Sequence, residues 1–138
     1  MITYEEYVGK WAHSADLTDV RMSNITDNLL PVVNAMYEYL VSFGVKFRIN
    51  PSTGSKISGQ TYGGFRPQNC PQGAPHSSHK EGLAVDIYDP ENEIDNWLMD
   101  NQEVLKDFGV YIEHPDKTNH WSHWSVKPPG SGKHVFYP

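Results

Sequence analysis

Histidine and aspartate side chains concentrate in the second half of the chain, at a spacing that suits a metal ion. The chain contains seven histidines, and five of them lie within residues 76–123. His79 precedes the apolar run at residues 83–88, and Asp86 lies inside that run. An ionised carboxylate in a buried strand is costly unless a partner compensates for it, and a metal ion is a natural partner. We therefore predict that Asp86 is a metal ligand.

Two further ligands are predicted from the local sequence. A turn at Gly82 would bring the side chains of His79 and Asp86 together. The segment 120–124 (HWSHW) reads as a neighbouring strand and offers a third histidine. Three protein ligands with an open fourth position are typical of catalytic zinc, whereas structural zinc has four protein ligands. The ordinary alternatives are hydrogen-bonded or core histidines and an aspartate that accepts backbone hydrogen bonds.

Several other chemistries are excluded by the residues that the chain lacks. The single Cys70 rules out a cysteine-rich zinc site and an intramolecular disulfide. The motifs HExxH and GxSxG are absent, so the sequence offers no zincin helix and no nucleophile elbow. Trp121 and Trp124 lie on either side of His123, where they pack under the site or line a cleft, and we expect core packing.

Composition and charge further restrict what kind of protein this is and which partners it can have. The 138 residues are enough for one domain, which we place at residues 1–138 with its core at about 20–126. The net charge of −6 and the lack of a basic stripe argue against nucleic acid or an anionic membrane as partner. No apolar run approaches the roughly 18 residues of a membrane span, so we expect no membrane insertion. The N-terminal residues do not resemble a secretory signal.

The elements that must position these residues follow from periodicity. Apolar residues at helical spacing predict the main helix at residues 25–43, capped by Ser23 or Thr26 and ended by Gly44. Residues 50–78 are rich in glycine and proline and read as a long functional loop. The remaining elements are a short helical or loose arm at 1–12, a helix at 91–108, and strands at 45–49, 83–88, 110–112, 121–126 and 134–136. This order predicts an α+β fold with a small antiparallel or mixed sheet flanked by helices.

Three segments together resemble a known family. They are Gly64-Phe65-Arg66-Pro67, the run from Gly73 through His76-Ser77-Ser78-His79, and Gly82-Leu83-Ala84-Val85-Asp86-Ile87. They are similar to motifs of the zinc D,D-carboxypeptidase and L-alanyl-D-glutamate endopeptidase family. The run Tyr111-Ile112-Glu113-His114-Pro115 before Trp121-Ser122-His123-Trp124, with the short tail after it, resembles small phage-encoded members of that family. That family cleaves the stem peptides of bacterial peptidoglycan and shares its fold with the Hedgehog signalling domain. The resemblance therefore implies a Hedgehog-like, D,D-peptidase-like fold.

The resemblance also implies roles for single residues. It makes His79, Asp86 and His123 the ligands of one Zn²⁺ ion. Arg66 matches the arginine that grips a substrate carboxylate or carbonyl, a task suited to a planar guanidinium. Ser77 matches the serine before the first ligand, where it either binds substrate or holds the loop.

The general base is where this sequence departs from the family pattern. Many members place glutamate or histidine two or three residues before the last ligand, but here those positions hold Trp121 and His120. Hedgehog-like members carry a glutamate further back, at the end of the preceding strand, and Glu113 resembles it. We expect Glu113 to be the base, with His120 as second candidate or as a donor to the oxyanion.

The implied activity is hydrolysis of peptidoglycan stem-peptide amide bonds, of the D-Ala-D-Ala carboxypeptidase type. One alternative is an endolysin-like L-Ala-D-Glu endopeptidase. Another is a non-catalytic, zinc-containing wall-binding or virion module, for which a fourth ligand such as His76 or His120 would argue. We expect a monomer that is made in the cytoplasm and acts on the cell wall, during host lysis or as part of a virion.

Overall fold

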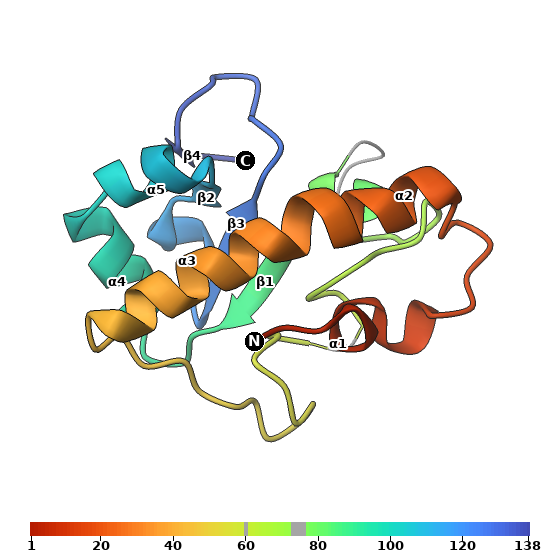
Figure 1. The fold of residues 1–138 in the computed structure, drawn as a ribbon, viewed down its shortest axis with the longest axis horizontal. Coiled ribbons are helices and arrows are strands. Elements are labelled where there is room, and N and C mark those ends of the chain that lie inside the picture. The colour runs from red at the N-terminus through yellow and green to blue at the C-terminus, as the bar shows by residue number, and fades with distance from the viewer. Residues whose placement is uncertain (60, 73–76) are drawn as a thin grey trace.

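A four-stranded mixed sheet forms the centre of the molecule in the computed structural model, which describes residues 1–59, 61–72 and 77–138 (Figure 1). Its strands are β1 (Ala84–Tyr88), β2 (Tyr111–Glu113), β3 (Trp121–Ser125) and β4 (Val135–Phe136), in the order β1-β3-β2-β4. β3 runs antiparallel to β1 and β2, and β4 runs parallel to β2. The predicted α+β class with a small mixed sheet is confirmed.

A long helical segment crosses one face of this sheet (Figure 1). It consists of α2 (Asp19–Ser23), a π-helical stretch (Asn24–Leu29) and α3 (Leu30–Ser42). The predicted start near Ser23 or Thr26 is wrong, because the Thr18 side chain already caps the first turn by accepting from the Arg21 N–H. The π-helical stretch ends two residues before Pro31, which has no N–H to donate to a regular helix.

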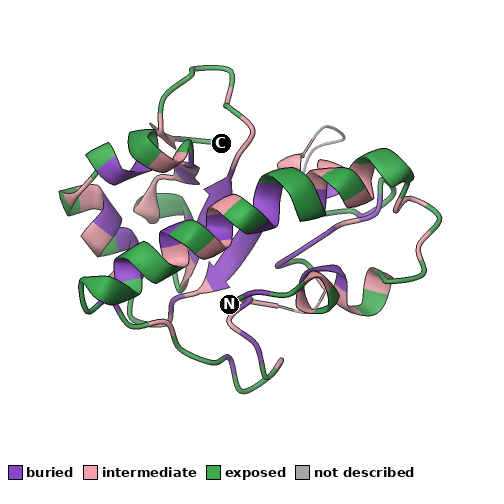
Figure 2. Ribbon diagram, viewed as in Figure 1, coloured by how far each residue is buried: buried purple, intermediate pink, exposed green. Residues whose placement is uncertain are grey.

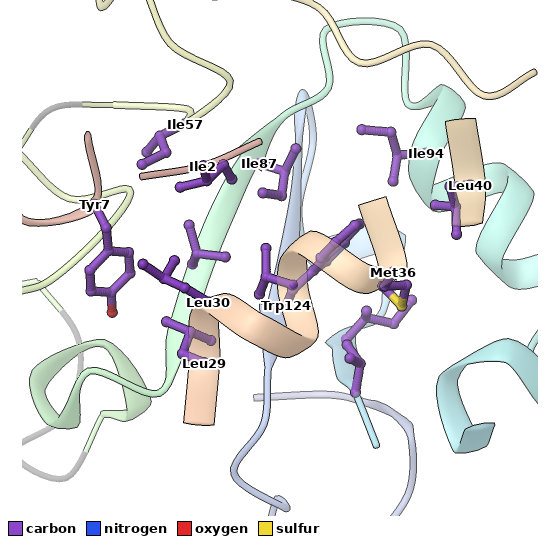
Figure 3. Packing of buried hydrophobic residues seen from close by; sticks show 14 of the residues in the cluster. Ile2, Tyr7, Leu29, Leu30, Met36, Leu40, Ile57, Ile87, Ile94 and Trp124 are labelled. Atoms are coloured by element: carbon purple, nitrogen blue, oxygen red, sulfur yellow. The ribbon is translucent and has the colours of Figure 1, made fainter. Parts of the chain in front are cut away.

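The core lies between this helix and the sheet. Ile87 and Trp124 face the helix, and Leu29 and Met36 pack from the other side (Figure 3). All four are at most 1% exposed. Figure 2 shows the same pattern as a buried stripe along β1 beneath the helix. Since successive residues of a strand point to opposite faces, the residues between these positions point away from the helix.

Two further predictions about the elements were wrong. Residues 45–49 form no strand, because the free edge of β1 is occupied by the later segment 56–58, whose Ser58 N–H donates to the Asp86 carbonyl. The helix predicted at 91–108 is two helices, α4 (Glu93–Asp100) and α5 (Glu103–Phe108). Asn101 breaks the helix with a non-helical φ of −136°. None of the described helices is long and apolar enough to cross a membrane.

The N-terminal segment is helical, as one of the two alternatives predicted, but it is not loose. It forms α1 (Tyr4–Val8) and a 3-10 turn (Gly9–Trp11). The buried Tyr7 hydroxyl donates to the Ala84 carbonyl at 2.7 Å, and the Trp11 indole donates to the Thr61 carbonyl at 2.9 Å. The segment therefore ties β1 to the loop that precedes it.

Candidate metal centre

His79, Asp86 and His123 come together as a buried group that can hold a metal ion. Their potential ligand atoms all lie within 4.8 Å of one another. Asp86 Oδ1 is 3.2 Å from His79 Nε2 and 2.9 Å from His123 Nδ1. Ligand atoms around a tetrahedral ion with bonds of about 2.0–2.2 Å lie roughly 3.4 Å apart. The distances from Asp86 Oδ1 to the two histidine nitrogens are thus already close to those between ligand atoms around a coordinated ion.

The sheet register places two of these ligands and one candidate base in a single row. Asp86 on β1 is directly opposite His123 on β3. The β2–β3 register pairs Ile112 with Trp124, so one further residue along each strand sets Glu113 beside His123. Glu113 is in turn paired with Phe136 on β4. All four residues of this row lie on the face of the sheet opposite the core.

A short 3-10 helix (Ser78–Glu81) carries His79 to the end of this row. Ser77 caps it, since its hydroxyl accepts from the His79 N–H, which supports the loop-holding role foreseen for this serine. Gly82 follows with a φ of +74°, a conformation that L residues rarely adopt. The predicted turn at Gly82 is therefore confirmed, and it returns the chain into β1.

The orientation of the His79 ring is fixed by a backbone contact. Its Nδ1–H donates to the Gly64 carbonyl at 2.8 Å, so Nε2 is the ring nitrogen that faces Asp86 and can bind a metal. A Cβ on Gly64 would lie 2.0 Å from the backbone oxygen of Tyr7, so only glycine fits. α1 thus contributes to the site from the far end of the sequence.

Charge and burial act together on Asp86 and His123. Burial raises the pKa of Asp86, but the charges and hydrogen bonds of His79 and His123 more than offset it and hold that pKa well below its usual range. Burial lowers the pKa of His123, but the hydrogen bond and charge of Asp86, together with the charge of Glu113, outweigh burial and raise it. Asp86 is therefore an ionised carboxylate and suits a cation.

Arg66 makes a contact that the sequence did not predict. Its Nη2 lies 3.3 Å from Asp86 Oδ2, while its Nε donates to the Tyr62 carbonyl at 2.8 Å. The guanidinium thus holds the oxygen of Asp86 that faces away from the two histidines. Arg66 also lines an open recess beside the three ligands, so its side chain remains available to a substrate.

An open recess of about 620 Å³ lies over the ligand row, and we call it the first recess. Besides the three ligands and Arg66, its lining includes Ser77, Ser78, Glu113, Trp121, Gly130 and Phe136. Trp124 is fully buried as predicted, but Trp121 is only half-buried and forms part of the wall. Strand alternation could have predicted this position, because Trp121 lies two residues before His123 and therefore on the same face of β3. The Phe136 ring, 6.1 Å from the His123 ring, was not identified in advance because nothing in the sequence predicted the β2–β4 pairing.

The two candidate bases are placed differently. Glu113 lines the first recess beside His123. His120 is exposed, has a φ of +78°, and its Nδ1 bonds to the Pro90 carbonyl at 3.0 Å. The structure does not bring His120 into the recess. His76, the other residue considered as a fourth ligand, lies outside the described residues.

Comparisons with protein-family models, with curated proteins and with solved structures return no match for this chain.

Proposed function

We propose that the chain is a zinc-dependent peptidase that hydrolyses amide bonds in peptidoglycan stem peptides. The observation that carries the proposal is the buried group His79, Asp86 and His123, with Glu113 beside it in an open recess. The motifs that resemble the peptidoglycan metallopeptidases supply these same residues. A Hedgehog-like arrangement of the fold belongs to the same proposal.

The donor set suits zinc. Two imidazoles and one carboxylate are common protein ligands of catalytic zinc, whose fourth position is left to water or substrate. Within residues 1–59, 61–72 and 77–138, three side chains of these types form the group, namely His79, Asp86 and His123. When bound, the ion would polarise the scissile carbonyl and lower the pKa of a water toward about 7.

Glu113 is the group that moves the proton. Its carboxylate takes a proton from the attacking water and returns it to the leaving amine. Its position next to His123 favours it over His120, whose ring is engaged with the Pro90 carbonyl. A rate contribution of about 10²–10⁴ is typical of such a residue.

Arg66 has two tasks in this account. It holds Asp86 Oδ2 through the 3.3 Å contact of its Nη2, and it presents its remaining N–H groups to the carbonyl or carboxylate of a peptide. Ser77 stabilises the turn under His79 and stands at the recess wall. Trp121 and Phe136 offer apolar surface to the substrate chain.

The test compares wild type with Glu113→Gln on purified peptidoglycan. We expect wild type loaded with zinc to release fragments whose masses correspond to cut stem peptides. Glu113→Gln should bind zinc equally and release almost none. If zinc-loaded wild type leaves the peptidoglycan intact but still binds it, the non-catalytic wall-binding module replaces this proposal.

A further inference from the structure

We infer that Asp95 is a positioning residue of the metal centre, which holds β3 in the register that places His123 opposite Asp86. Asp95 lies on α4 and does not line the first recess, so it acts through the residues that it contacts. This inference rests on the metal centre of the proposed function and adds the side chain that sets its geometry from the core side of the sheet.

One hydrogen bond joins Asp95 to the loop between the candidate base and the last ligand. The Thr118 hydroxyl donates to Asp95 Oδ2 at 2.8 Å, and both residues are 0% exposed. Thr118 belongs to the connection 114–120, which links β2, with Glu113 at its end, to β3, which carries His123. The bond therefore fixes the start of β3 relative to α4.

A second contact acts on β3 itself. Ser122 is fully buried and points to the core face, because it lies one residue before His123. Its hydroxyl lowers the pKa of Asp95, while its Oγ accepts the Trp124 indole N–H at 2.8 Å. A slip of β3 by one residue would break both contacts and turn His123 away from Asp86.

The strand that carries Asp86 is tied to the same helix. Asp89 directly follows β1, and its carboxylate accepts the Ile94 N–H at 3.2 Å and the Asp95 N–H at 3.1 Å. The Asp89 N–H donates to the His120 carbonyl, at 3.1 Å, directly before β3. The end of β1 and the start of β3 are therefore both anchored at the start of α4.

Stability alone does not explain a carboxylate at position 95. Asp95 Oδ1 forms no hydrogen bond with any residue in the described part of the chain. A buried carboxylate with an unpaired oxygen destabilises a fold, and apolar side chains often replace buried charged groups without loss of stability. What an apolar side chain cannot supply is a directional bond to a hydroxyl, and fixing register is the best attested use of such buried polar groups.

Three variants separate positioning from stability. Asp95→Ala removes the acceptor, and Thr118→Val removes the 2.8 Å bond while keeping the shape of the side chain. Ile94→Val is the matched control, because Ile94 is equally buried on α4 and the substitution changes packing only. All proteins are compared at a temperature where they are folded. If Asp95→Ala does not fold, Thr118→Val decides.

Two measurements follow the metal centre. Competition with a chelator gives the zinc affinity, and the visible absorption of the Co²⁺-loaded protein reports the arrangement of ligands around the ion. We expect Asp95→Ala to lose about 10–100-fold in zinc affinity, as is typical of residues that orient a metal ligand. Thr118→Val should show a smaller loss, and both should change the Co²⁺ spectrum. Ile94→Val should keep the affinity and the spectrum of wild type.

Hydrogen exchange of the metal-free proteins separates this inference from the proposed function. In Asp95→Ala and Thr118→Val, the amides of β3 should lose more protection than those of α3, whereas Ile94→Val should affect both elements alike. If wild type binds no zinc but this pattern appears, the peptidase proposal fails and Asp95 still sets the register of β3. Wild-type zinc affinity and Co²⁺ spectrum in both variants, or an equal loss in Ile94→Val, would overturn the inference.

Discussion

Asp86 and His123 face each other across the β1–β3 pair, with Asp86 Oδ1 2.9 Å from His123 Nδ1. One backbone register therefore sets the distance between two ligands, without any long loop between them. The same ladder extended to β2 brings Glu113 to the site. Any change that shifts β3 by one residue would move His123 into the core and Trp124 out of it.

Replacing Arg66 should weaken metal binding as well as substrate binding. Arg66→Ala frees Asp86 Oδ2, and losing a residue that orients a metal ligand typically costs about 10–100-fold in metal affinity. Arg66→Lys keeps the charge but not the planar fork, so it should restore only part of the affinity. Competition with a chelator measures zinc affinity, and KM for the stem peptide is measured alongside it. Wild-type values of both in Arg66→Ala would remove Arg66 from the site.

The two candidate bases are separated by a pair of variants. Glu113→Gln should retain zinc and lose about 10²-fold or more of kcat, because the amide cannot take the proton of the water. His120→Ala should keep kcat close to wild type, since its ring points to the Pro90 carbonyl. Steady-state kinetics on zinc-saturated proteins gives the comparison. The reverse pattern would make His120 the base.

Gly64→Ala should destabilise the fold. Its new Cβ would collide with the Tyr7 carbonyl, which is backbone and cannot move aside easily. We expect a loss of about 2 kcal/mol or more in the free energy of unfolding, measured by urea denaturation. Gly59→Ala, whose Cβ meets nothing within 4 Å, is the matched control and should stay within about 0.5 kcal/mol of wild type. Equal stabilities of the two variants would mean that α1 does not pack on Gly64.

Asp95 should make stability depend on pH. It is fully buried on α4, and burial raises its pKa to about 6, against the lowering effect of the Ser122 and Thr118 hydroxyls. The folded protein then holds a proton that the unfolded chain has released, so stability falls as pH rises from about 4 to 6. The shift corresponds to roughly 2–3 kcal/mol.

The variant Asp95→Asn cannot titrate and should lose this dependence. Its free energy of unfolding, minus that of wild type, should therefore rise between pH 4 and pH 7 by about that amount. Taking the difference cancels the titration of the histidines, which both proteins share. A difference that stays constant across this range would show that Asp95 is ionised throughout.

Much of the site was predictable because its residues lie in short local patterns. Asp86 inside an apolar strand, Gly82 at a turn, and His123 two residues after Trp121 all follow from strand and turn chemistry. The resemblance favoured Glu113 over His120 as the base, but the position of Glu113 beside His123 depends on the pairing of β2 with β3, which the sequence does not reveal. The contact of Arg66 with Asp86 joins residues 20 positions apart through a loop without regular periodicity.

Each element that was predicted wrongly has its own physical explanation. Residues 45–49 alternate as a strand should, but alternation alone does not provide a neighbour for hydrogen bonding. The edge of β1 is taken by residues 56–58 instead, a pairing that only the folded chain reveals. Likewise, the helical spacing from Leu29 onward is clear, but the cap at Thr18 lies in a segment without apolar periodicity.

The most direct test of the metal centre is elemental mass spectrometry of wild type, Asp86→Ala and Asp116→Ala, each purified without an affinity tag that binds metal. Asp116 is a suitable control, because its side chain is 72% exposed and lies away from the ligand row. The account predicts one zinc per chain in wild type and in Asp116→Ala, and none in Asp86→Ala. Folded wild type without metal, or stoichiometric zinc in Asp86→Ala, would contradict it.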